Sequence, residues 1–147
     1  MLVKTTAGHP DVVRLAALQR LELTERYGAD VTSAGVDPDS PAILLRLNKQ
    51  TVGCVALDIT VDRAEITRMY VIREARGMGL SRLLLARIEE TAVSKGIHTV
   101  RLTTGLEQPE AMALYSSSGY TRIPCYGKSA ARDRCFEKRL PYLPRSA

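Results

Sequence analysis

Short stretches rich in β-branched and aromatic residues alternate along the chain with longer segments of helical periodicity. The strand-like stretches are 2–6, 42–48, 52–60, 65–72, 99–103, 122–123 and 134–140. Segments 11–26 and 80–93 have apolar residues at helical spacing, and Pro109 stands where a third helix begins. Strands joined by short turns come first, and a helical crossover then leads to a parallel strand. This order predicts one α+β domain over residues 1–147, with a mixed, mostly antiparallel sheet flanked by helices.

The two long helices are expected to pack through one apolar face each. In the first, the residues in rough helical register are Val12, Leu15, Leu18, Leu21 and Glu22. In the second, the expected apolar face is Leu80, Leu83, Leu84, Ile88 and Ala92. The segments 28–41 and 124–133 are interpreted as loops, and 141–147 as a loosely held tail.

A glycine-rich turn lies between the strand at 65–72 and the helix that starts at Leu80. Its residues are Arg76-Gly77-Met78-Gly79. A turn of this kind directs free backbone N–H groups to the space before the helix, where the helix dipole also favours an anion. Glycine lets a ligand approach the backbone closely. An ordinary strand-to-helix turn would have the same appearance, so the rest of the chain must decide.

At these residues the chain resembles the GNAT N-acetyltransferase superfamily. Arg76-Gly77-Met78-Gly79-Leu80-Ser81 is similar to its R/Q-x-x-G-x-G/A signature, with Ser81 in the place of the usual Gly or Ala. A second family stretch, N/Q-x-x-A-x-x-L-Y-x-x-x-G-F/Y, is matched by Gln108, Ala111, Leu114, Tyr115, Gly119 and Tyr120. The two motifs occur in the family's order and spacing, and the resemblance is specific over 42–140.

The resemblance implies a GNAT fold, an α/β/α arrangement in which a parallel strand pair splays apart to admit the pantetheine arm of acetyl-CoA. It implies acetyl-CoA as co-substrate, no metal, and a phosphate site at the glycine turn. The cofactor-binding residues implied are Met69, Tyr70, Val71, Arg76, Gly77, Met78, Gly79, Leu80, Ser81, Arg82, Gln108 and Tyr115. Arg76 and Arg82 are the candidate phosphate partners, and each could instead be a solvated charge.

Two residues are candidates for catalysis. The resemblance implies that Glu65 is a general base that deprotonates the amine through a water molecule. The alternative is a solvated or salt-bridged glutamate at a strand edge, with water or another carboxylate as the base. The resemblance also implies that Tyr115 lies near the CoA sulfur and donates a proton to the thiolate. The alternative for Tyr115 is a half-buried aromatic residue whose hydroxyl is bonded locally.

Composition and charge fit this interpretation. The net charge of +5 suits a polyanionic co-substrate, whereas 7 aromatic residues and no long basic run argue against nucleic-acid binding. No apolar stretch is long enough to span a membrane. Cys54, Cys125 and Cys135 have no metal-ligand spacing, and reduced thiols in the cytoplasm are expected.

The sequence therefore predicts an enzyme that moves an acetyl group from acetyl-CoA to a primary amine on a small molecule or peptide. The alternative is a non-catalytic acyl-CoA-binding regulatory module of the same fold. The acceptor amine is open. A homodimer is compatible with the resemblance.

Overall fold

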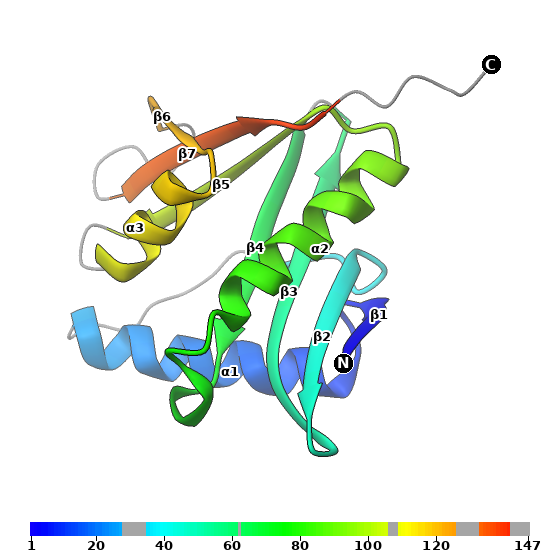
Figure 1. Ribbon diagram of the computed structural model, residues 1–147, viewed down its shortest axis with the longest axis vertical. Helices are drawn as coiled ribbons and strands as arrows, with labels where there is room; N and C mark the ends of the chain where they lie inside the picture. Colours follow the sequence, from blue (N-terminus) through cyan, green and yellow to red (C-terminus); the bar gives the residue numbers. More distant parts are fainter. Residues whose placement is uncertain (28–34, 62, 106–108, 126–132, 142–147) are drawn as a thin grey trace.

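The computed structural model describes residues 1–147 except 28–34, 62, 106–108, 126–132 and 142–147 (Figure 1). The described strands are β1 (Leu2–Thr6), β2 (Pro41–Leu47), β3 (Gln50–Thr60), β4 (Arg63–Val71), β5 (Thr99–Gly105), β6 (Thr121–Ile123) and β7 (Asp133–Arg139). The helices are α1 (Pro10–Tyr27), α2 (Leu80–Ser94) and α3 (Pro109–Ser117), with a 3₁₀ turn, η1 (Arg73–Ala75), after β4. The predicted strands and helices are therefore confirmed, with most ends shifted by one or two residues.

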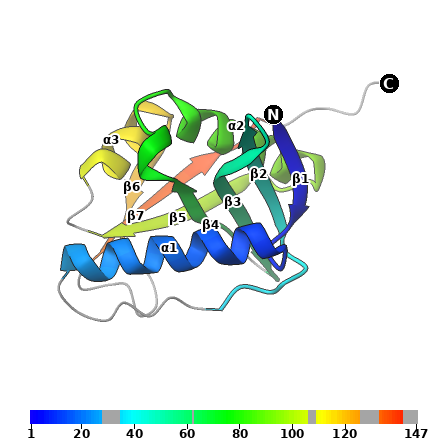
Figure 2. The same ribbon diagram turned by 90° about the horizontal axis from the view of Figure 1, so that it is seen from below.

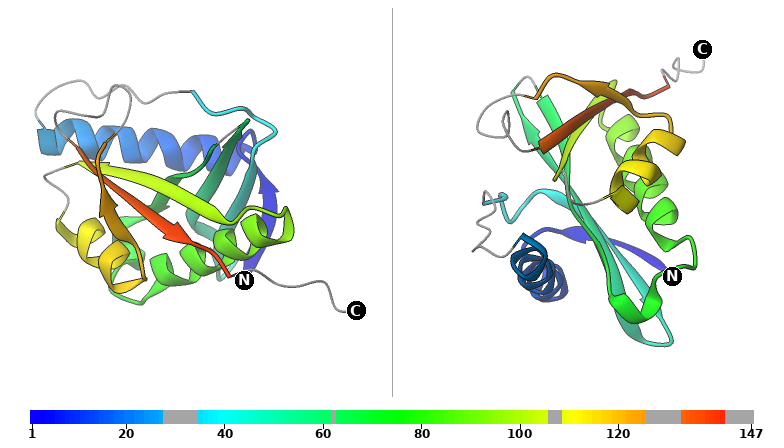
Figure 3. Two further views of the ribbon diagram at one scale, coloured as in Figure 1. Left: turned by 90° about the horizontal axis from the view of Figure 1, so that it is seen from above. Right: turned by 90° about the vertical axis from the view of Figure 1, so that its left-hand side faces the viewer.

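These strands form one seven-stranded sheet in the order β1-β2-β3-β4-β5-β7-β6. Neighbouring strands are antiparallel, except that β4 and β5 are parallel. Helix α1 lies against one face of the sheet, and α2 and α3 lie on the other (Figures 2 and 3). The predicted α+β architecture with one parallel pair is confirmed.

Both faces of the central strands are buried, each under a helix. On the α2 side, Leu84 and Ile88 pack with alternate residues of the strands, such as Ile43. On the α1 side, Val12 and Leu15 pack with the intervening residues of the same strands. A buried leucine or isoleucine contributes about 1.5–3 kcal/mol. Burial on both faces fixes the register of these strands, since a slip of one residue would exchange the two sets.

Helix α2 is rotated slightly from the face that the sequence predicts. Leu85 is buried and Leu83 is half exposed. The buried row of the helix is Leu80, Leu84, Leu85, Ile88 and Ala92.

Helix α1 differs from its predicted face in the same way. Leu18 and Leu21 are exposed, while Gln19 and Glu22 are partly buried and continue the inner row that begins with Val12 and Leu15. Two polar side chains thus take positions on the sheet-facing side of α1, and both make contacts there that are described below.

Strand β4 contains a β-bulge opposite β3. Cys54 is in register with Tyr70, and Ala56 with Thr67, so β4 has one more residue than β3 across this interval. Arg68 in the bulge has φ 57°, a left-handed conformation that costs a non-glycine residue about 1–2 kcal/mol.

The bulge changes the alternation of side chains along β4. Ala64 and Ile66 belong to the α2-side core before the bulge, and Val71 belongs to it after the bulge. On the α2 side of β4, the buried residues are thus even-numbered before the bulge and odd-numbered after it. Tyr70 packs with the α1-side core as a result.

The cysteines differ from the expectation of reduced thiols. Cys125 and Cys135 form a disulfide with a Cα–Cα distance of 5.1 Å, and Cys54 is a free, buried thiol. Cys135 lies on β7 in register with Ile123 on β6, so the pairing of these strands brings Cys125 beside it. The prediction was wrong because sequence spacing does not show which cysteines a sheet brings together. The predicted cytoplasmic location loses one of its premises and stays a prediction.

Within the residues that the structure describes, the helices include none that is long and apolar enough to cross a membrane.

Candidate active site

The parallel strands β4 and β5 part from each other along their length. Their register in the described residues consists of one pair, Glu65 with Arg101, near the start of both strands. Beyond that pair the strands diverge toward their carboxyl ends, as Figure 1 shows. In sheets with parallel strands, ligands bind in the crevice outside the carboxyl ends of the strands. The place where the pairing of β4 with β5 ends, called the opening below, is therefore the first component of a candidate site.

The glycine turn lies beyond the carboxyl end of β4, next to this opening. Gly77 and Gly79 have φ values of 84° and 75°, and a Cβ atom on either would meet nothing within 4 Å. Gly79 is the N-cap of α2 and supplies no side-chain cap, and the first turn of the helix has no acidic residue. The first N–H groups of α2 are thus available to an anion such as a phosphate group. Exposed Met78 and half-buried Ser81 flank this turn.

Arg76, the first residue of the turn motif, is bound to helix α1. Its guanidinium donates two hydrogen bonds of 2.7 Å to the two carboxylate oxygens of Glu22. Its Nε donates to the Val71 carbonyl at 2.9 Å, and its guanidinium lies 5.4 Å from the centre of the Tyr70 ring. The Tyr70 hydroxyl also donates to Glu22, at 3.0 Å. Arg76 therefore holds β4, α1 and the turn together, a role that its prediction as a phosphate partner did not include.

The electrostatics of this cluster favour an ionised Glu22. Hydrogen bonds from Arg76, with a further one from Tyr70, hold the pKa of Glu22 below its ordinary value against the opposing effect of burial. Burial, followed by the bond to Glu22, raises the pKa of Tyr70. The carboxylate is therefore negative and the phenol neutral at physiological pH, and the pair with Arg76 persists there.

Strand β4 is also held by a second side chain from α1. Gln19 Nε2 donates to the Met69 carbonyl, next to the bulge, at 2.9 Å. Arg76 binds the Val71 carbonyl. Two of the three β4 residues predicted to bind the cofactor, Met69 and Val71, therefore already accept a side-chain hydrogen bond at the backbone carbonyl. The sequence analysis placed Glu22 in the register of this helix but not at the site, and it did not single out Gln19. The available signal was that both residues occupy the 3.6-residue continuation of the face that begins at Val12.

Arg82, the other candidate phosphate partner, connects α2 with α3. Its guanidinium donates to the hydroxyl oxygens of Ser117 at 2.7 Å and Ser118 at 3.3 Å. Arg82 is exposed and lies in the first turn of α2, so its positive charge is close to the glycine turn even while it holds α3.

Glu65 belongs to a row of charged residues across the sheet. The register places Asp58, Glu65, Arg101 and Glu137 side by side on β3, β4, β5 and β7. Arg101 Nε donates to Glu137 Oε2 at 2.8 Å. Glu65 alternates with residues that face α2, so it lies on the α1 side of the sheet. It is half buried, as a base shielded from bulk solvent would be.

Tyr115 lies on the opposite side of the sheet, in an aromatic cluster. Its ring centre is 5.8 Å from that of Tyr120 and 5.9 Å from that of Phe136. Burial raises the pKa of Tyr115 to about 12. The Tyr120 hydroxyl donates to Glu89 at 2.7 Å, whereas the Tyr115 hydroxyl has no hydrogen-bond partner in the described part of the chain. The local bond proposed as its alternative role is thus not seen among these residues.

Four features predicted from the sequence lie wholly or partly outside the described residues. Gln108, the predicted ligand of the CoA arm, is one of them. The others are the segments 28–41, 124–133 and 141–147, of which 28–34, 126–132 and 142–147 lie there.

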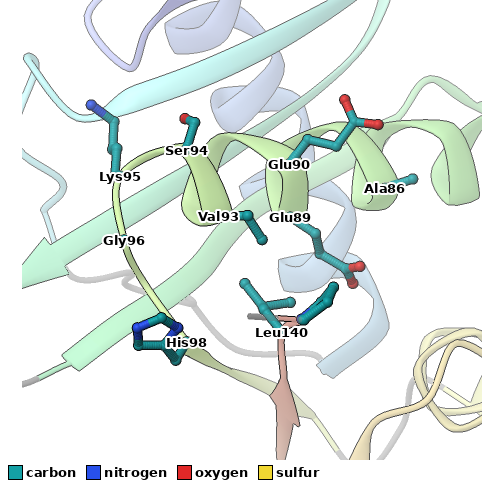
Figure 4. Close-up of a pocket in the computed structure, with 10 residues that line it drawn as sticks. Ala86, Glu89, Glu90, Val93, Ser94, Lys95, Gly96, His98 and Leu140 are labelled. Atoms are coloured by element: carbon teal, nitrogen blue, oxygen red, sulfur yellow. The ribbon is translucent and has the colours of Figure 1, made fainter. Parts of the chain in front are cut away.

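A separate hollow lies at the other end of α2 (Figure 4). It is lined by residues of the last turns of α2 and of the segments next to β5 and β7, including Glu89, Lys95, His98 and Leu140. Glu89 is already bound by Tyr120 and, at 2.9 Å, by Lys138 Nζ. The 15 residues of α2 span roughly 20 Å between this end and the glycine turn. The hollow is not part of the candidate site.

Solved structures share this architecture. A Klebsiella pneumoniae protein assigned provisionally as an acyl-CoA N-acyltransferase is 26% identical, with a TM-score of 0.80 over 95% of this chain and 97% of that chain. A GNAT family acetyltransferase from Elizabethkingia anophelis, solved with acetyl-CoA bound, is 18% identical, with a TM-score of 0.71 over 95% and 97% of the two chains. The chain thus has the same overall fold as these two proteins.

The sequence comparisons identify the family. Residues 11–120 match the model of the acetyltransferase (GNAT) family. An IAA acetyltransferase of Azospirillum brasilense is 32% identical, over 71% of this chain and 76% of that protein. The chain belongs to the GNAT acetyltransferase family.

Proposed function

We propose that this protein transfers an acetyl group from acetyl-CoA to a primary amine while both substrates are bound. The observation that carries the proposal is the glycine turn at the uncapped N-terminus of α2, beside the opening between β4 and β5. Family membership supports acyl transfer, and the relative with acetyltransferase activity in its name supports acetyl as the group transferred.

The residues at the opening suit a CoA thioester. The N–H groups of Gly77 to Ser81 would bind the pyrophosphate, and Arg82 would add positive charge. The edge of β4 beyond Glu65, where the described register with β5 ends, would bind the arm as it would bind an added strand. Acetyl-CoA supplies an activated acetyl group, so the protein has to position it, deprotonate the amine and assist departure of the thiolate.

Glu65 is proposed as the general base. An ammonium group must lose a proton before its nitrogen can attack, and a carboxylate on the α1 side of the sheet can accept that proton through one water molecule. Arg101, which is in register with Glu65, is engaged by Glu137 at 2.8 Å.

Tyr115 is proposed as the hydrogen-bond donor to the sulfur. With a pKa of about 12 its hydroxyl keeps its proton at neutral pH, so it is always ready to donate. The thiol of CoA, by contrast, is an alkyl thiol like that of free cysteine, whose pKa is about 8.5. Full transfer of the proton from Tyr115 to the thiolate is therefore uphill, and the hydroxyl acts mainly by orienting and stabilising the sulfur.

The proposal is tested with the purified chain by calorimetric binding of CoA and by release of free thiol from acetyl-CoA with a panel of amines. We expect binding, and turnover with at least one amine. Binding without turnover on any amine would favour a non-catalytic acyl-CoA module, and absence of binding would reject both functions.

Two matched glycine variants test the position of the site. Gly79→Glu puts a negative side chain at the proposed phosphate site, and Gly96→Glu puts the same side chain at the other end of α2. Both glycines have positive φ and open space around a Cβ, so the backbone strain is similar. We expect Gly79→Glu to lose CoA binding and Gly96→Glu to keep it. Equal affinities in two folded variants would contradict the assignment.

A further inference from the structure

Thr104 on β5 carries a buried hydroxyl that has no hydrogen-bond partner among the described residues. The residue is 5% exposed, and its Oγ1 is a buried side-chain polar atom for which the described part of the chain offers no hydrogen-bond partner. Buried hydroxyl groups in folded proteins nearly always have a partner, because leaving one without costs free energy. An exception of this kind calls for a ligand or another explanation.

The position of Thr104 on β5 indicates which ligand its hydroxyl would bind. Thr104 shares a face of β5 with Val100 and Leu102, which belong to the same core cluster as Tyr115. Leu102 is in register with Phe136, whose ring contacts that of Tyr115. Thr104 lies two residues further on, about 7 Å along the strand. This is the direction in which β5 leaves β4 (Figure 1).

Two hydroxyl groups without a partner in the described structure therefore lie on the same side of β5, the side that faces α2 and α3. One belongs to Thr104 and the other to Tyr115. The nucleotide end of CoA is charged and would stay at the glycine turn. The arm is a narrow, mainly apolar chain interrupted by amide groups and ended by the thioester, so it can lie between strands that have parted and offer them hydrogen-bonding groups.

We propose that the Thr104 hydroxyl is a hydrogen-bonding ligand of the pantetheine–thioester arm of acyl-CoA. The inference rests on the proposed function. It makes Thr104 a substrate-binding residue on the strand opposite β4, so that the arm is held from both sides of the opening. The Thr104 hydroxyl, which has no partner among the described residues of the free protein, gains a hydrogen bond when the arm lies between β4 and β5.

The proposal predicts opposite effects of one substitution on two measurements. Thr104→Val keeps the shape of the side chain and removes the hydroxyl. The free protein should unfold at the same temperature or higher, because no existing bond is lost and an unmet polar group disappears. Affinity for acetyl-CoA should fall about 5- to 10-fold, the usual effect of one hydrogen bond.

Controls separate this role from others. Thr104→Ser keeps the hydroxyl and should retain most of the affinity. Thr103→Val removes the neighbouring hydroxyl, which contacts Cys135 Sγ at 3.5 Å on the opposite face, and should leave acetyl-CoA affinity unchanged. Adenosine 3′,5′-bisphosphate, a probe without the arm, should bind wild type and Thr104→Val equally.

The outcomes are distinguishable. If wild type fails to bind acetyl-CoA, the proposed function fails and this inference with it. If wild type binds and Thr104→Val binds equally well, the inference alone is overturned. If Thr104→Val does not fold, Thr104→Ala is measured in its place, and unchanged acetyl-CoA affinity in that variant overturns the inference.

Discussion

Individual side chains at the site are distinguished by whether their polar atoms are already bonded. The hydroxyl groups of Tyr70 and Tyr120 donate to carboxylates, whereas that of Tyr115 has no partner among the described residues. These tyrosines therefore differ in whether the hydroxyl group is available to bind a substrate. A tyrosine bound to a carboxylate stabilises the fold, and one with an unbonded hydroxyl can serve a substrate.

This difference gives a prediction for Tyr115. Tyr115→Phe removes the donor and keeps the ring contacts with Tyr120 and Phe136. We expect turnover to fall roughly 10- to 10³-fold with little change in CoA affinity or stability. Tyr120→Phe is the control, and it should lower thermal stability without this loss of turnover, because its hydroxyl serves Glu89. Full activity of Tyr115→Phe at every pH would remove the hydroxyl from the mechanism.

The proposed base is tested against its neighbour in the sheet. Glu65→Gln should lower turnover at neutral pH on the order of 10²-fold, with CoA affinity nearly unchanged, because the amide cannot accept the proton. Asp58→Asn changes the carboxylate in register with Glu65 on β3. If Asp58→Asn has the large effect and Glu65→Gln has none, the base is Asp58 and Glu65 is structural.

At the scale of elements, α1 braces the site from the face opposite α2. Gln19 binds β4 beside its bulge, and Glu22 binds both Arg76 and Tyr70. A helix on one side of the sheet thereby positions a turn whose ligand-binding N–H groups belong to a helix on the other side. The brace works because the bulge places Tyr70 on the α1 side, where it packs with the α1-side core.

Glu22→Gln tests this brace. The amide keeps one hydrogen bond and loses the charge that holds Arg76, so the turn becomes less well positioned. We expect CoA affinity to fall about 3- to 10-fold and stability to fall by about 1 kcal/mol, a modest loss because Arg76 is partly exposed. Glu25→Gln, an exposed position about one turn further along α1, should change neither. Unchanged CoA affinity in Glu22→Gln would leave the pair a purely structural contact.

The sequence predicted these elements well and their fine positions less well. Strand composition, helical spacing and the glycine turn are local signals, and each predicted element was found. The rotation of α1 was not predicted, because the exposed residues Leu18 and Leu21 fit a rough helical periodicity as well as the inner residue Gln19 does. The bulge gives no sequence signal, since Arg68 is not a residue type that favours positive φ.

The candidate site was predictable only where a motif marks it. The glycine turn and Tyr115 stand in motifs, whereas Thr104 and the contact of Glu22 with Arg76 depend on the packing of separate elements. The Cys125–Cys135 bond likewise depends on the pairing of β6 with β7. Contacts between distant segments follow from the packed fold, so a single sequence does not contain a local signal for them.

At the scale of the whole molecule, burial of ionisable groups makes the fold sensitive to alkaline pH. Burial raises the pKa of Cys54 to about 12, from an ordinary value of 9.0. Between these values the unfolded chain has lost this proton and the folded chain keeps it, so rising pH favours unfolding. Tyr115 acts in the same direction above an ordinary pKa of 10.0, because its folded pKa is about 12.

The free energy of unfolding should therefore decrease from about pH 9 to about pH 12. The contribution of Cys54 is a slope of at most about 1.4 kcal/mol per pH unit. Denaturant unfolding at several pH values measures it, and Cys54→Ala should flatten the curve in this range. A Cys54→Ala curve parallel to that of wild type would show that the thiol ionises equally easily in the folded protein.

The position of β7 between β5 and β6 has a consequence for biosynthesis. β7 is made after every other described strand, yet it pairs with two of them. While the ribosome is still translating 133–139, β6 lacks its partner, and β5 has a free edge on one side and a diverging neighbour on the other. A nascent chain at that stage exposes unpaired strand edges, which favour aggregation. The sheet can therefore close on this side only after 133–139 are available to insert between β5 and β6.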